Sequence, residues 1–277
     1  MSEERRIELE IVVPGTPEEV WEAIATGPGI TSWYVPHTVV EEEGGAATAS
    51  FGPGPEMQIA GRVAAWEPPT RIVFDKGEGV PGLAFEWLIE ARDGGSCVVR
   101  LVNTGFGSGE EWDAQYDGMV EGWRMFLFNL RMHLEHFRGR TATPILPLGM
   151  WEGSPEAGWA RLTDLLGLPS DAAVGDRVSS DSANAPAFSG TVVDAALHRL
   201  SLLVDEPAPG TAFLVVEGAA GATGVSVWFY LYGDSGASAA ARDESRWWSF
   251  LAEHGMHPEA EPRAVEKVED RNTGSSP

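Results

Sequence analysis

Two histidine pairs are the residues of this 277-residue chain whose spacing is closest to that of a metal site. HLEH places His133 and His136 three positions apart, and HGMH does the same for His254 and His257. A zinc site on a helix needs at least one further ligand, and neither pair has one nearby in the sequence. We interpret both pairs as solvated helix ends, and we expect no metal, no cofactor and no catalytic residue.

The segment TGFGSG at residues 104–109 resembles a loop that holds phosphate with backbone amides. It lacks the spacing and the lysine of a P-loop. Glu110, Glu111 and Asp113 also follow it, at the helix start where a phosphate would have to lie. We therefore interpret the segment as a tight turn between a strand and a helix.

Large aromatic side chains are more informative than these polar motifs. Phe85, Trp87 and Ile89 alternate along one run, so they share one face of a strand. Many large side chains with a few polar tips are typical of a closed apolar pocket, although ordinary core packing is the alternative for any one of them. The predicted ligand-binding residues are Trp33, Tyr34, His37, Phe51, Met57, Phe85, Trp87, Met119, Trp123 and Phe126.

Periodicity predicts the elements that would position these side chains. RRIELEIVVP alternates apolar and charged residues, as a half-buried strand does. GTPEEVWEAI then begins a helix, with Thr16 as N-cap and Pro17 in the first turn. TSWYVP favours a second short helix, and the runs after it are separated by turns rich in Gly, Pro and Asp. These predicted strands are 38–43, 46–51, 56–66, 70–75, 83–91 and 97–104.

A long helix is predicted at about 110–138, and it is apolar on two sides. One stripe, which includes Trp123, would pack on the sheet of its own domain. The opposite stripe consists of Met125, Phe128 and Met132, and it would lie in water unless a second surface covered it. We expect the C-terminal half to cover it, with a homodimer contact or a surface patch for another protein as the alternatives.

The second half of the chain repeats segments of the first half in the same order. GSPEAGWARL at 153–162 corresponds to GTPEEVWEAI at 15–24, and ESRWWSFLAEHG at 244–255 corresponds to EGWRMFLFNLRM at 121–132. Four matches in one order indicate a duplication. The other two pairs are 61–78 with 190–207 and 83–106 with 211–234.

The duplication predicts a division of the chain into two domains. The first would span 1–140, and TATPILPLG at 141–149 would be a linker. The second would span 150–257, with its long helix at about 238–255. The remaining residues, 258–277, have no apolar period, and we expect them to be disordered.

Composition limits the classes of molecule that the protein can bind and the cellular compartment in which we expect it. The formal charge of −23 is spread over both halves, and a field of that sign repels nucleic acids and anionic lipids. No apolar run approaches 18 residues, so we expect no membrane span. The charged N-terminus lacks an apolar signal region, which favours a cytoplasmic protein. Cys97 is the one cysteine of the chain, which excludes a disulfide framework. Because it lies in the apolar run CVVRLV, we expect it to be a buried thiol in a strand.

Several motifs carry a resemblance to a known family, and together they cover most of residues 5–138. They are IxVPGTPEEVWEAI, GPGITSWYVP, WEPPTRIVF, TGFGSGEEWDAQYDGMVEGW and NLRMHLE. With these motifs the first half resembles the AHSA-type branch of the START-like (SRPBCC, helix-grip) superfamily. The resemblance implies an antiparallel sheet that grips a long C-terminal helix, with a cavity between them. It also implies binding of a small apolar ligand or co-chaperone-like protein contact, and it defines no universal catalytic residues.

The predicted fold class is therefore α+β, with two helix-grip domains that each wrap a curved antiparallel sheet around a long helix. We expect the first cavity to bind a small hydrophobic molecule and the second domain, which lacks a counterpart of SWYVP, to be a structural partner. A cyclase- or hydrolase-type enzyme is one alternative, and a protein-interaction module is another. The polar residues placed near the cavity are His37, Tyr34 and Arg100, the last only if its side chain points inward.

Overall fold

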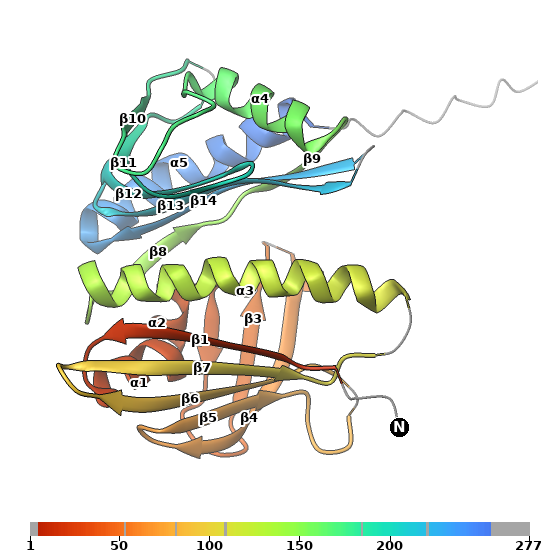
Figure 1. Cartoon of the computed structure of the whole chain (residues 1–277), viewed down its shortest axis with the longest axis vertical. Helices are drawn as coiled ribbons and strands as arrows, with labels where there is room; N and C mark the ends of the chain where they lie inside the picture. Colours follow the sequence, from red (N-terminus) through yellow and green to blue (C-terminus); the bar gives the residue numbers. More distant parts are fainter. Residues whose placement is uncertain are drawn as a thin grey trace, which may run out of the picture.

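The two halves of the chain form two antiparallel sheets of seven strands each, with the long helix α3 between them (Figure 1). The computed structural model describes residues 5–52, 54–80, 82–107, 110–183, 185–219 and 222–255. In these ranges no helix is long and apolar enough to cross a membrane. The tail at 258–277 and His257 lie outside the described residues.

The first domain has the element order that the sequence predicts, with strand order β1-β7-β6-β5-β4-β3-β2. The second short helix is displaced, since it spans Gly27–Thr31 and not TSWYVP. It begins at Gly27 because the Thr26 hydroxyl caps it by accepting from the Gly29 amide at 3.0 Å. The elements are β1 (Ile7–Pro14), α1 (Pro17–Ala25), α2 (Gly27–Thr31), β2 (His37–Val39), β3 (Ala46–Ser50), a 3₁₀ turn (Pro55–Met57), β4 (Gln58–Glu67), β5 (Arg71–Asp75), β6 (Ala84–Arg92), β7 (Ser96–Thr104) and α3 (Glu110–His136).

The second domain repeats this arrangement in strand order β10-β11-β12-β13-β14-β8, with β9 also paired to β14. Its long helix α5 begins about one turn earlier than the sequence predicts, at Gly233. The elements are β8 (Ala142–Ile145), β9 (Leu148–Trp151), α4 (Pro155–Leu166), β10 (Arg177–Ser180), β11 (Phe188–Ala196), β12 (Arg199–Glu206), β13 (Gly210–Ala219), β14 (Ala222–Tyr232) and α5 (Gly233–Glu253).

Residues 141–149, which we expect to be a linker, instead contain β8 and the start of β9. Both strands pair with β14, in the position that β1 occupies beside β7. The prolines of TATPILPLG favour a linker, but an edge strand tolerates proline because one side of it needs no ladder hydrogen bonds. Pro144 lies opposite Tyr230 at this edge.

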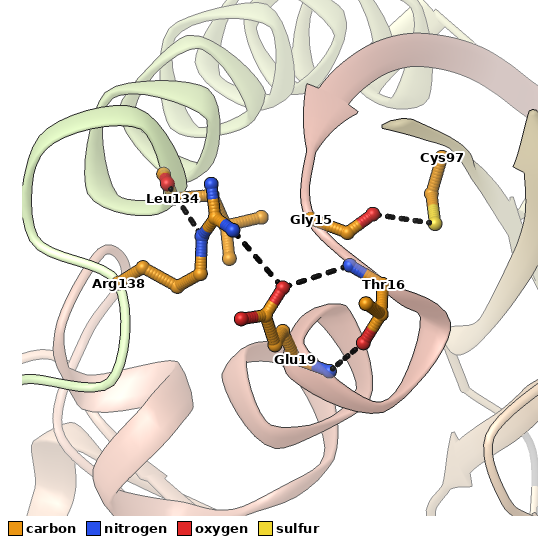
Figure 2. A network of polar contacts seen from close by, with 6 residues as sticks. All are labelled: Gly15, Thr16, Glu19, Cys97, Leu134 and Arg138. Carbon is orange, nitrogen blue, oxygen red and sulfur yellow. Dashed lines mark hydrogen bonds and ion pairs between the residues drawn. The ribbon is translucent and has the colours of Figure 1, made fainter. Parts of the chain in front are cut away.

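A polar network ties the first turn of α1 to the end of α3 (Figure 2). The Thr16 hydroxyl accepts from the Glu19 amide, and one Glu19 carboxylate oxygen accepts from the Thr16 amide at 2.8 Å. The same oxygen accepts from Arg138 at 3.0 Å, and Arg138 also donates to the Leu134 carbonyl. Beside this network Cys97 is a buried free thiol of β7, as the sequence predicts.

The second sheet covers the side of α3 that faces away from the first sheet. Met125 and Met132 are buried and Phe128 is half-buried. Met125 belongs to a cluster of buried side chains that continues across α3 to the second sheet. Phe126 stacks on Trp228 of β14 with ring centroids 5.6 Å apart. The cluster's fully buried members from the second sheet are Phe213, Tyr230 and Tyr232.

The buried amide of Asn129 crosses this interface. Its nitrogen donates to the Trp33 carbonyl at 2.8 Å, and its oxygen accepts from the Thr211 hydroxyl at 2.7 Å. One side chain of α3 therefore holds both the segment after α2 and strand β13 of the other domain. Because Asn129 is fully buried, neither bond can be replaced by water without a rearrangement.

His133 lies in the same interface, so its interpretation as part of a solvated helix end is wrong. Its ring stacks on Tyr232, and Nδ1 lies 2.9 Å from the Tyr232 hydroxyl. That hydroxyl donates its proton to the Ser32 carbonyl at 2.8 Å, so Nδ1 of His133 is the donor. Burial lowers the pKa of His133 to about 4. His136, one turn further on, is exposed.

We expect substitution of Asn129 by alanine to lower the free energy of unfolding by roughly 2–4 kcal/mol, because it leaves a buried carbonyl and a buried hydroxyl unpaired. Thr211→Val should cost less, since it removes one of the two bonds. Denaturant unfolding of the full chain measures both. The control is Glu121→Ala at an exposed position of α3, expected within about 0.5 kcal/mol of the parent. Equal stability of Asn129→Ala and the parent would contradict the assignment.

The buried His133 predicts a loss of stability in mild acid. Its pKa is about 4 in the folded chain against an ordinary 6.5, so its contribution is complete above pH 6.5 and is lost as the pH falls toward 4. Between pH 7 and pH 5 the parent should lose about 2 kcal/mol more than His133→Asn, which keeps a donor near Nδ1 but does not titrate. Unfolding at each pH measures this, and His136→Asn is the control. Parallel pH curves for the parent and His133→Asn would show the prediction to be wrong.

Candidate functional site

A pocket lies in the first domain between the inner face of its sheet, helix α2 and helix α3. Its volume is about 100 Å³. The walls are almost entirely aliphatic and aromatic. The lining residues are Ile24, Ile30, Trp33, Tyr34, His37, Ala49, Phe51, Ile59, Phe74, Phe85, Trp87 and Trp123. We call this the inner pocket.

A second hollow of about 270 Å³ adjoins the inner pocket, and we call it the outer groove. It is more polar at its rim, where Arg62 and Asp75 form an ion pair at 2.9 Å beside Lys76. The hydrogen bond from Arg62 lowers the pKa of Asp75, so that carboxylate is charged and paired at neutral pH. The residues that line both spaces are His37, Ala49, Ile59, Phe74 and Phe85.

Three tryptophans form the inner wall of the pocket. Trp33 meets Trp87 edge-to-face with ring centroids 5.6 Å apart, and Trp87 meets Trp123 at the same distance. The indole nitrogen of Trp33 donates to the Ala23 carbonyl at 2.8 Å, which fixes its ring. Because these rings pack on one another, the inner pocket alone is smaller than typical ligand pockets of roughly 300–1,000 Å³. Only together with the outer groove does it reach the lower end of that range.

Tyr34 and His37 bring polar atoms to this apolar wall. The Tyr34 ring lies against Phe126 and Trp123, with centroids 4.4 and 5.0 Å away. Burial raises its pKa well above the ordinary value of a tyrosine, so it stays protonated. Burial also lowers the pKa of His37, although the carbonyl of Val35, 2.7 Å from Nδ1, acts against this. Both side chains are therefore neutral at pH 7.

The structure brings most of the predicted ligand-binding residues to one place. Those that line the inner pocket are Trp33, Tyr34, His37, Phe51, Phe85, Trp87 and Trp123. Their role in binding stays a prediction.

Three predicted residues are not among the lining residues. Met57 is in the 3₁₀ turn with 38% of its surface exposed, because the turn before β4 carries it away from the inner face. Phe126 turns toward the second domain and stacks on Trp228. Met119 packs half-buried against the core cluster at another part of α3.

Five aliphatic or aromatic lining residues are absent from the set that the sequence predicts. Strand alternation could have identified Phe74, since it lies two residues after the fully buried Ile72 in β5 and therefore shares a face with it. Ile59 at the start of β4 has no comparable signal, because it is half exposed and lies between Gln58 and Ala60, which do not extend an apolar alternation. The complete set is Ile24, Ile30, Ala49, Ile59 and Phe74.

Arg100 does not reach the pocket. It pairs with Glu10 across β1 and β7 at 2.6 Å, while its neighbours Val99 and Leu101 are buried on the inner face. The side chain therefore lies on the outer face of the sheet. Throughout the described ranges, no group of three His, Cys, Asp or Glu side chains could hold a metal ion.

Residues 14–135 match the sequence profile of the family described as Activator of Hsp90 ATPase homolog 1-like protein (AHSA1). No curated protein matches the sequence.

Among solved structures, the di-domain ARO/CYC BexL from the BE-7585A biosynthetic pathway is similar over 93% of this chain and 100% of BexL, with 16% identity and a TM-score of 0.44. The Aha1 dimer of Colwellia psychrerythraea is similar over 49% of this chain and 99% of its own, with 19% identity and a TM-score of 0.39. A protein of Mesorhizobium loti is similar over 48% of this chain and 98% of its own, with 18% identity and a TM-score of 0.41.

The motifs, the strand order and the profile match lead to one conclusion. The N-terminal half of the chain resembles the AHSA1 family over residues 14–135, and the C-terminal half is a degenerate second copy of the same helix-grip fold.

Proposed function

We propose that this protein binds a small hydrophobic molecule in the inner pocket and the outer groove of its first domain. The observation that carries the proposal is the composition of the inner wall, where aliphatic and aromatic side chains surround the polar atoms of Tyr34 and His37. A preformed apolar pocket with few polar groups is typical of a small-molecule site. Binding is favoured because a ligand displaces water from these apolar walls.

The second domain supports this function as a structural partner. The space between its sheet and α5 is filled by large buried side chains, among them Trp151, Phe229 and Trp247. Its outer face packs on α3 and, through Asn129, holds the carbonyl of the pocket residue Trp33. The first domain thus keeps a pocket, and the second stabilises the segment that forms one wall of it.

An enzyme acting in this cavity has less support. Acid–base catalysis needs positioned groups that accept and donate protons, and nucleophilic catalysis needs a nucleophile beside a base. Among the described lining residues of the inner pocket there is no carboxylate, lysine, serine or cysteine. Arg100, the third polar residue expected near the cavity, lies on the other face of the sheet. Binding is therefore the function that the pocket supports best.

Indane, a small bicyclic hydrocarbon, tests the proposal with the full chain. We expect a saturable quenching of tryptophan fluorescence, because Trp33, Trp87 and Trp123 form the inner wall. Ala49→Phe would place a ring in the space shared by pocket and groove, and it should weaken binding about tenfold or more.

The matched control is Ala195→Phe, at an exposed position of β11 in the second domain, which should bind indane as the parent does. Thermal unfolding checks that both variants are folded. If indane gives no saturable change, or if Ala49→Phe binds it unchanged, the inner pocket is not a binding site for apolar molecules.

A further inference from the structure

We propose that His37 selects hydroxylated aromatic ligands for this pocket, by accepting a hydrogen bond from a phenolic hydroxyl at its Nε2 atom. The inference rests on the proposed function and names the class of ligand.

The tautomer of His37 follows from its contact with the backbone. Nδ1 lies 2.7 Å from the Val35 carbonyl oxygen. A carbonyl oxygen can only accept, so Nδ1 carries a hydrogen. The backbone amide of His37 donates to the Thr31 hydroxyl at 2.9 Å, which holds the residue in place as β2 begins. A neutral imidazole with its hydrogen on Nδ1 presents a lone pair at Nε2.

The charges around the ring keep it neutral. Burial lowers the pKa of His37, and among the lining residues described for the inner pocket there is no carboxylate to stabilise an imidazolium. In the outer groove the acidic lining residue Asp75 is already paired with Arg62, and Lys76 would oppose a second positive charge. Nε2 is therefore an acceptor and not a donor at pH 7.

The position of the His37 ring places Nε2 where a bound ligand would contact it. His37 lines both the inner pocket and the outer groove, so it lies where the two spaces join. Its ring is 5.5 Å from that of Tyr34, and within the described part of the chain no hydrogen bond of Nε2 is found. A ligand that fills the pocket displaces water from Nε2, and only a ligand with a donor at that point replaces the lost hydrogen bond.

A neutral donor on an aromatic ring fits this environment better than a cation or an acid. A buried ammonium would lack a counter-ion in the inner pocket, and a carboxylate would face a lone pair instead of a donor. The edge-to-face arrangement of the tryptophans offers faces and edges to a planar ring. A phenol combines such a ring with one hydroxyl donor, and a site built around the half-buried acceptor of His37 discriminates against the analogue that lacks the donor.

Three related probes and two variants of the full chain test the inference. The probes are 5-indanol, 5-methoxyindane and indane, with dissociation constants measured by tryptophan fluorescence. The parent should bind 5-indanol about tenfold more tightly than 5-methoxyindane, although the ether loses less hydration on transfer from water. His37→Asn places an amide near Nδ1, keeps the bond to Val35 and lacks an acceptor at Nε2, so the two affinities should become nearly equal. His37→Gln places its amide near Nε2 and should restore part of the preference.

Each outcome has one meaning. Equal binding of the phenol and the ether by the parent overturns the inference and leaves the proposed function standing, provided that indane binds. A preference for the phenol that survives in His37→Asn also overturns it, because another group must then supply the acceptor. If none of the three probes binds, the proposed function itself fails.

Discussion

The amide of Asn129 joins three parts of the molecule that are far apart in the sequence. It holds the Trp33 carbonyl with its nitrogen and the Thr211 hydroxyl with its oxygen, inside an interface from which water is excluded. Two further bonds reinforce the same junction: the Tyr232 hydroxyl donates to the Ser32 carbonyl, and the Ala142 amide donates to the Ser32 hydroxyl. The segment that carries Trp33, Tyr34 and His37 is thus fixed by the second domain as well as by its own. Domain packing and pocket geometry are therefore coupled through buried hydrogen bonds.

The sheets of the two domains differ in how many of their faces are covered. In β14, Trp228, Tyr230 and Tyr232 face α3 while Phe229 and Leu231 face the core of their own domain. This strand is apolar on both faces because helices cover both, and its sequence reads as a continuous apolar run. In β6 of the first domain, Trp87 faces inward, whereas Glu86 and Glu90 alternate with it toward the outer side. Among the described residues, elements cover the first sheet on one face only, as is common for an antiparallel sheet at a protein surface.

Periodicity and capping residues predict most of the fold, since they reflect local physics that the tertiary structure does not override. Thr16 and Ser154 begin corresponding helices, and the alternation of Ile7 and Leu9 predicts β1. The prolines at 141–149 are misleading because an edge strand and a linker tolerate the same residues.

The candidate site is harder to predict from the sequence than the fold is. Strand alternation and the aromatic residues identify much of the pocket wall, but they do not show which side of a helix a second domain covers. His133 would be solvated if no second domain covered its side of α3, and it is buried when one does. Asn129 gives a weak signal: a polar side chain one turn before a histidine, within a helix that is apolar on two sides. Only the three-dimensional arrangement shows that both are covered and paired.

The position of α3 between two sheets also has a kinetic consequence. A helix that closes a cavity can move outward to admit a ligand if its outer side is free. Here an outward displacement of α3 would separate Phe126 from Trp228 and break both hydrogen bonds of Asn129. At the other end of the sheet, β2 is a three-residue edge strand, paired with β3 from His37 to Val39. Short edges open at a lower free energy than buried helices do. For the ligand binding proposed above, we therefore expect molecules to exchange between the pocket and the solvent when the β2 edge opens, because only the backbone pairing of β2 with β3 has to break there.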